Sequence, residues 1–104
     1  MSFFIRHRFG GQDRDPAISV FPALLDELAY GDPEHPEVAL VDDTGLALSV
    51  FASELVVIEN VETGDPGPRH LRCTDRDHVL RLLTALANQR YAELEAEAWT
   101  PGYG

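Results

Sequence analysis

The sequence predicts an α+β domain, an antiparallel sheet of four or five strands with two helices packed on one face, in the chain order β-α-β-β-β-(β)-α. Three apolar runs, VALV, LALSVF and LVVIENV, follow one another within residues 37–61 and are separated only by DDTG and ASE. Apolar stripes at helical spacing stand on both sides of this segment. Because the links are this short, the three runs should be antiparallel neighbours in one sheet. The two helices would then pack together on one face of that sheet. The 104 residues suffice for one core, so we expect a single domain over residues 1–104.

A strand, a loop and a helix are expected before the central segment. Alternating apolar residues predict a half-buried strand over residues 2–9. Residues 10–16, GGQDRDP, are polar and rich in turn formers, which indicates a loop. Ser19 is the expected N-cap of the helix, and Gly31 its end. The helix itself is predicted by one stripe at i, i+3, i+4 and i+7, made of Phe21, Leu24, Leu25 and Leu28.

The central segment is expected to be a three-stranded meander. Its first link, residues 42–45, has short polar side chains and a glycine that is free to take a positive φ, which is typical of a hairpin turn. In the third strand Val57 and Glu59 alternate with Val56 and Ile58, and polar residues gather at the C-terminal end. We therefore expect that end to be exposed or close to a binding surface.

An edge strand, a second helix and an irregular tail are expected in the last third. Residues 69–73 read as a possible short edge strand, and Thr74 as the N-cap of the helix. The helix either ends at Asn88 or continues through AELEAEA. Residues 99–104 are expected to be irregular, with Trp99 and Tyr103 either tying this segment to the core or forming a recognition tail. The stripe that predicts the helix consists of Val79, Leu80, Leu82, Leu83 and Leu86.

The charge balance excludes some classes of partner. A net charge of −10 argues against binding nucleic acid or an anionic membrane, both of which attract basic surfaces. No apolar segment reaches the roughly 18 residues that a membrane helix needs, and the N-terminal run is too short for a signal peptide. The single cysteine, Cys73, fits a reducing compartment, so we expect a cytoplasmic protein. The acidic residues either serve solubility alone or face a basic partner.

Two clusters could carry chemistry. Asp43-Thr44-Gly45 resembles the Asp-Thr-Gly signature of aspartic proteases, but Asp42 precedes it, Leu46 follows it, and a hairpin turn explains the same residues. The spacing H-x2-C-x4-H of His70, Cys73 and His78 could supply three zinc ligands, with Asp75 or Asp77 as a fourth. Cys73 could instead be a nucleophile near a helix N-terminus, with His78 as its base.

Neither cluster has the partners that its chemistry needs. The zinc spacing lacks a second ligand pair, and the Asp-Thr-Gly motif lacks the other elements of its fold. We therefore expect no catalytic residues, no cofactor and no metal ion. A small hydrolase built on Asp43 or Cys73 is kept as an alternative.

The order of elements resembles the small immunity proteins of bacterial polymorphic toxin systems. The resemblance lies in a strand, an LLDEL-type helix, the hairpin VALVDDTGLALSVF, the strand LVVIENV, a leucine-rich helix and a late tryptophan. Uncharacterised small bacterial α+β proteins share this layout. The resemblance implies a non-catalytic inhibitor that covers a toxin's active site.

An acidic surface would suit a basic toxin, because complementary fields speed association. The expected contact residues are Asp42, Asp43, Glu54, Glu59 and Glu62. The alternative partner is a second copy of the chain, in a homodimerising interaction module.

Overall fold

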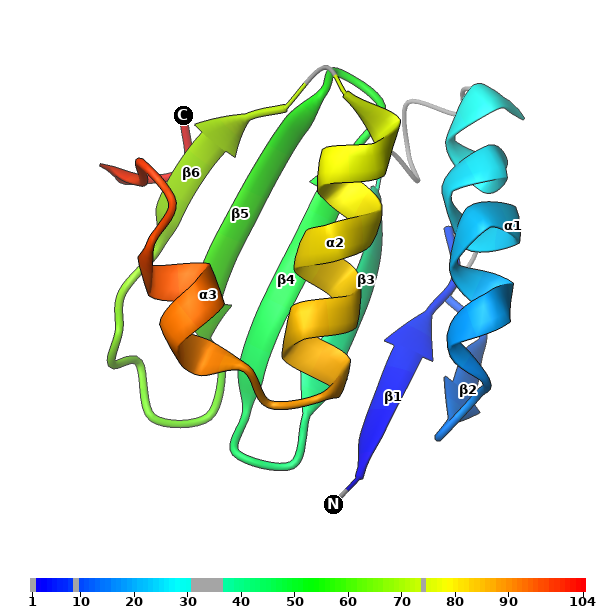
Figure 1. Ribbon diagram of the computed structural model, residues 1–104, viewed down its shortest axis with the longest axis horizontal. Coiled ribbons are helices and arrows are strands. Elements are labelled where there is room, and N and C mark those ends of the chain that lie inside the picture. The colour runs from blue at the N-terminus through cyan, green and yellow to red at the C-terminus, as the bar shows by residue number, and fades with distance from the viewer. Residues whose placement is uncertain (1, 9, 31–36, 74) are drawn as a thin grey trace.

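The computed structural model describes residues 2–8, 10–30, 37–73 and 75–104. Over these residues it shows a seven-stranded antiparallel sheet in the spatial order β2-β1-β3-β4-β5-β6-β7, with the helices on one face (Figure 1). The α+β class and the antiparallel sheet are confirmed, whereas the predicted number of strands was too low. The strands are β1 (Phe3–Arg6), β2 (Gln12–Arg14), β3 (Glu37–Asp42), β4 (Leu46–Phe51), β5 (Leu55–Asn60), β6 (Arg69–Arg72) and β7 (Thr100–Pro101).

The meander β3-β4-β5 forms as predicted, and β1 pairs with its outer strand. The register aligns Ile5, Leu40, Leu48 and Ile58 in one row across four strands. Each of these side chains is almost fully buried against the helices. This row therefore forms the floor of the hydrophobic core, and the alternate residues of the same strands point to the opposite face.

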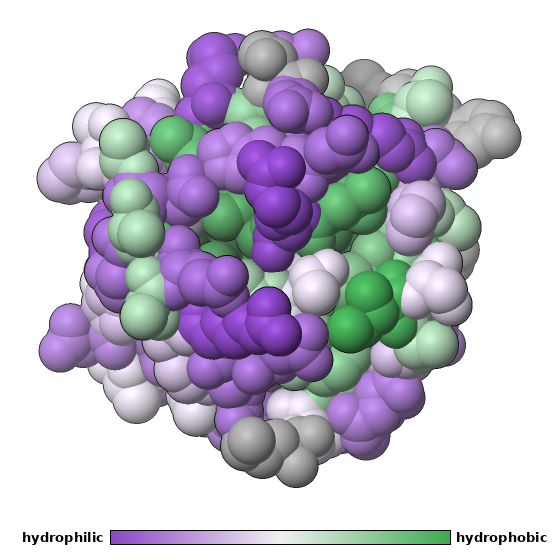
Figure 2. Space-filling view, viewed as in Figure 1, coloured by the Kyte–Doolittle hydropathy of each residue, from purple (hydrophilic) through white to green (hydrophobic). Residues whose placement is uncertain are grey.

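Three α-helices and two 3₁₀ turns make up the helical layer over the described residues. They are η1 (Ile18–Val20), α1 (Phe21–Asp26), η2 (Glu27–Tyr30), α2 (Arg76–Ala87) and α3 (Tyr91–Glu95). Phe21 and Leu24 of α1 and Leu83 and Leu86 of α2 are almost completely buried, as their stripes predict. Seen from the helix side, hydrophilic residues cover most of the surface over α2 and α3 (Figure 2). The helical layer thus buries one side against the sheet and exposes the other.

The helix ends differ from the predictions. Ser19 lies within η1, and the N-cap position of α1 is Val20, which makes no side-chain cap, so the predicted Ser19 cap is wrong. Asp75 caps α2 by accepting a hydrogen bond from the Asp77 amide at 3.0 Å. Asn88 ends α2, and α3 is a separate short helix. The predictions at Gly31 and Thr74 lie outside the described residues.

The two additional strands lie at the two edges of the sheet. β2 pairs with β1 within the segment that was expected to be a loop, and all three of its residues are exposed. Apolar periodicity could not reveal it, because it buries nothing. At the other edge, β7 pairs with β6 through Arg69 with Pro101 and His70 with Thr100, so β6 is not an edge strand and the tail is not wholly irregular.

Candidate functional site

The candidate site is the face of the sheet that the helices leave open. Side-chain alternation places Phe4, Val41, Ala47 and Glu59 in one row across this face, by the register of β1, β3, β4 and β5. The next row holds Arg6, Ala39, Ser49 and Val57. Small side chains thus occupy the middle strands, and longer ones stand on the flanks.

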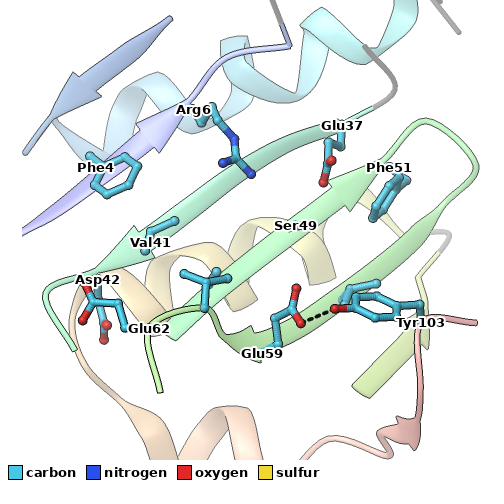
Figure 3. Close-up of a pocket in the computed structure, with 13 residues that line it drawn as sticks. Phe4, Arg6, Glu37, Val41, Asp42, Ser49, Phe51, Glu59, Glu62 and Tyr103 are labelled. Carbon is cyan, nitrogen blue, oxygen red and sulfur yellow. Dashed lines mark hydrogen bonds between the residues drawn. The ribbon is translucent and has the colours of Figure 1, made fainter. Parts of the chain in front are cut away.

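This arrangement makes a hollow with a cavity volume of about 340 Å³ (Figure 3). Its floor includes Val41, Ala47 and Val57, each at most 5% exposed although no helix covers them. The surrounding long side chains shield these residues from solvent. Around the floor stand Phe4, Arg6, Glu37, Phe51, Glu59, Val61, Glu62 and Tyr103.

The rim of the hollow combines acidic and apolar side chains. Glu59 and Glu62 line it on the β5 side, whereas Arg6 of β1 and Glu37 of β3 lie on the opposite side (Figure 3). The large hydrophobic side chains exposed among the described residues are Ile18, Val61 and Tyr103, and the last two belong to this rim, 58% and 61% exposed. Exposed apolar groups gathered beside polar ones are typical of interaction sites.

Asp42 lines the hollow at the hairpin turn, but its carboxylate is buried and engaged by other residues of this chain. It is 4% exposed, and its Oδ1 accepts hydrogen bonds from the Thr44 amide at 2.9 Å, the Thr44 hydroxyl at 2.6 Å and the Leu46 amide at 3.1 Å. Its Oδ2 accepts one from the Tyr91 hydroxyl at 2.6 Å. Burial, and then the hydrogen bond to Asp42, raise the pKa of Tyr91 to about 12. Asp42 therefore organises the hairpin turn and ties it to α3.

The remaining predicted contact residues divide between the two ends of the meander. Glu59 and Glu62 line the hollow, and exposed Asp43 lies in the turn at that end, bonded to the Gln89 amide nitrogen at 3.2 Å. Glu54 lies in the turn between β4 and β5, at the other end of strands that span roughly 17–20 Å. Three of the five, Asp42, Glu59 and Glu62, thus line the hollow, and the Asp42 carboxylate is buried there.

His70, Cys73 and His78 are not brought together. Nδ1 of His70 lies 3.0 Å from the Gly102 carbonyl oxygen, and Nε2 of His78 lies 2.8 Å from Oε1 of Glu97. Cys73 is buried in the core, and this burial raises the pKa of its thiol, the opposite of nucleophile activation. No group of three or more potential metal ligands occurs among the described residues.

His7 lies in a cluster that the sequence did not indicate. Its Nε2 lies 2.6 Å from Oδ2 of Asp13 in β2, and its Nδ1 lies 2.6 Å from Oε2 of Glu27 in η2. The hydrogen bonds to Asp13 and Glu27 raise the pKa of His7. A protonated ring donates to both carboxylates, so this cluster fastens the β1-β2 hairpin to the helical layer.

Arg6, Glu37 and Tyr103 are site residues that sequence reasoning missed. The first two could have been found from alternation, because Arg6 and Glu37 have the strand parity opposite to buried Ile5 and Val38. Nothing in the sequence places Tyr103, because the path of its segment depends on tertiary pairing with β6.

None of the helices in the described part of the chain is both long and apolar enough to span a membrane. Comparison with protein-family models, with curated proteins and with solved structures found no match.

Proposed function

We propose that this chain is a non-catalytic protein-binding domain that uses the open sheet face to bind a basic protein, and that it acts as an immunity-type inhibitor of a toxin. The observation that carries the proposal is the hollow on the helix-free face, with an apolar rim and the carboxylates of Glu37, Glu59 and Glu62. A net charge of −10 would steer a basic partner toward this chain.

The size of the face favours a protein partner. The hollow is partly enclosed by its rim and lies at the lower end of the roughly 300–1,000 Å³ that small-molecule sites occupy. Three six-residue strands and the four-residue β1, about 4.8 Å apart, offer roughly 350 Å². A standard interface needs about 800 Å² per partner, so the turns that flank the hollow, including Asp43, would join the contact.

The experiment is an affinity capture from lysate of the source cells with three forms of the protein. One form is the wild type, the second is Glu59→Arg/Glu62→Arg, and the third is Asp77→Arg/Glu93→Arg. The third form carries the same change of charge on exposed carboxylates of the helical layer. We expect the wild type and the third form to retain one basic protein that salt releases, and the second form to retain at least tenfold less.

If the second form retained as much of the basic protein as the wild type, the open face would not be the binding surface. If no basic protein were captured, a basic partner would be excluded. The captured protein is then assayed with and without this chain. An inhibitor suppresses its activity at a one-to-one ratio, whereas a protein-binding domain without this role leaves it unchanged.

The second candidate is a homodimer through the same face. Arg6 and Arg14 lie on the β1-β2 flank, whereas Glu59 and Glu62 lie on the β5 flank. Two copies face to face about a two-fold axis parallel to the strands would therefore oppose unlike charges. Sedimentation at low and high salt tests it. A dimer that dissociates in salt and in Glu59→Arg/Glu62→Arg supports this candidate, and a monomer at every concentration contradicts it.

A further inference from the structure

The segment after α3 returns to the sheet and is fastened to β6 as far as Gly102. β7 pairs with β6, the Gly102 amide donates to the Pro68 carbonyl oxygen at 2.8 Å, and the Gly102 carbonyl oxygen lies 3.0 Å from Nδ1 of His70. Gly102 has a φ of +96°, a left-handed conformation that favours glycine and turns the chain. Residues 103–104 therefore leave the edge of the sheet at a fixed point.

Beyond that point, residues 103–104 reach the open face. The Tyr103 hydroxyl donates to Oε2 of Glu59 at 2.5 Å, and the Tyr103 side chain forms one wall of the hollow (Figure 3). A Cβ placed on Gly104 would lie 3.1 Å from Cδ2 of Leu55, so this residue sits against β5. The segment closes the β5 end of the hollow with a side chain that remains 61% exposed.

The hydrogen bond between Tyr103 and Glu59 is of a kind that a cation can replace. A phenol offers one donor to the carboxylate, whereas a guanidinium offers two in parallel and a full positive charge. The hydrogen bond to Glu59 raises the pKa of Tyr103, so the hydroxyl stays a neutral donor at physiological pH. Since the Tyr103 side chain is exposed, releasing it uncovers little apolar surface.

We propose that Tyr103 closes the hollow in the unbound protein, and that an arginine or lysine side chain of the partner enters by replacing the Tyr103 hydroxyl on Glu59. This proposal rests on the proposed function, and it names both the group that is recognised and the hydrogen bond that breaks on binding. Tyr103 is then a specificity-determining residue, because only a side chain that can take over its hydrogen bond opens the site.

The test uses a fluorescein-labelled octa-arginine peptide as the probe, with binding followed by fluorescence anisotropy at low salt. Tyr103→Phe keeps the ring but frees Glu59, so we expect binding about three- to tenfold tighter than wild type, the effect of removing one competing hydrogen bond. Ser2→Ala is the matched control, because it removes an exposed hydroxyl–carboxylate bond, from Ser2 to Asp15, at the β1-β2 edge of the sheet. Its affinity for the probe should stay within twofold of wild type.

A second measurement follows the segment itself. In amide NMR spectra, the Gly102 and Gly104 signals of the wild type should move on probe addition toward their positions in Tyr103→Phe, which cannot make the hydrogen bond to Glu59. Signals that stay in place while the probe binds would overturn the proposal.

The outcomes separate the two proposals. If Glu59→Arg/Glu62→Arg binds the probe as tightly as Asp77→Arg/Glu93→Arg, the open face is not the cation-binding surface and the proposed function fails. If only the first pair loses binding, but Tyr103→Phe binds no tighter than wild type, the proposed function stands and the closing role of Tyr103 is overturned. Weaker binding by Tyr103→Phe also overturns it, because Tyr103 would then contact the ligand directly.

Discussion

Replacing Tyr91 with phenylalanine should destabilise the protein far more than the same change at Tyr103. Oδ2 of Asp42 accepts the Tyr91 hydroxyl at 2.6 Å, and Asp42 is only 4% exposed. Tyr91→Phe leaves this buried carboxylate oxygen without its donor, which costs about 2 kcal/mol. In a domain near this size that lowers the thermal midpoint by roughly 8–16 °C. Tyr103 makes its hydrogen bond in solvent, so Tyr103→Phe should leave the midpoint close to wild type.

The pH dependence of the Tyr91 effect has a definite sign. The folded-state pKa of Tyr91 is about 12, above the ordinary value of 10, so the folded protein holds this proton more tightly than the unfolded chain does. The stabilisation is therefore complete below pH 10 and is lost as the pH rises toward 12. Urea unfolding of wild type and Tyr91→Phe at pH 8 and pH 11 should show a smaller difference at pH 11.

A fall of less than about 0.5 kcal/mol in the free energy of unfolding of Tyr91→Phe at pH 8 would refute the reasoning. So would a difference between wild type and Tyr91→Phe that grows from pH 8 to pH 11. A difference that grows with pH would mean that folding does not tighten the hold on the Tyr91 proton. A small loss would mean that water, rather than Tyr91, satisfies the Asp42 carboxylate. Asp42 would then be open to the solvent and again a possible contact residue.

Two further substitutions test local features. His7→Gln should reduce stability most below pH 6, because Asp13 and Glu27 raise the pKa of His7 above its ordinary 6.5 and the hydrogen bonds to them weaken as the ring loses its proton. Urea unfolding of both proteins across pH 5–9 measures this. A difference in stability between wild type and His7→Gln that widens with pH would contradict the prediction. Gly45→Ala should lower the free energy of unfolding in urea by about 2–3 kcal/mol, because φ is +89° and the new Cβ would meet neighbouring side-chain atoms at 2.8 Å. In Gly10→Ala the new Cβ meets nothing within 4 Å, so the loss should be about 1 kcal/mol. Equal losses would show that backbone strain alone determines the loss of stability.

The central part of the fold could be predicted because its sequence signals are local. Alternation in LVVIENV indicated the two faces of β5, and the leucine stripe indicated α2. Both describe buried positions, where the hydrophobic effect constrains the residue type. β2 and β7 have no such signal, because Gln12–Arg14 is exposed throughout and Thr100–Pro101 has only two residues. β7 is positioned by pairing with β6, which is distant in sequence, and β2 is positioned by a polar hairpin with β1.

The candidate site could be predicted only in part, for a related reason. Alternation put Glu59 on the strand face opposite to Ile58, and in the structure Glu59 lines the hollow. The sequence also suggested the contact residue Asp42, which lines the hollow but shares the parity of Val38 and Leu40, so that its carboxylate is buried. Its partner Tyr91 is 49 residues away in sequence. Pairings of this kind arise only once α3 packs against the meander.

The small residues on the floor of the hollow belong to a set of positions that is separate from the core. Odd-numbered positions of β3 and β5, such as Ala39 and Val57, face outward, and the even-numbered positions between them, such as Leu40 and Ile58, hold the core. A substitution in the outward set can reshape the hollow without touching the helix-facing side. The shape of the hollow can therefore change while the same inward residues continue to specify the fold.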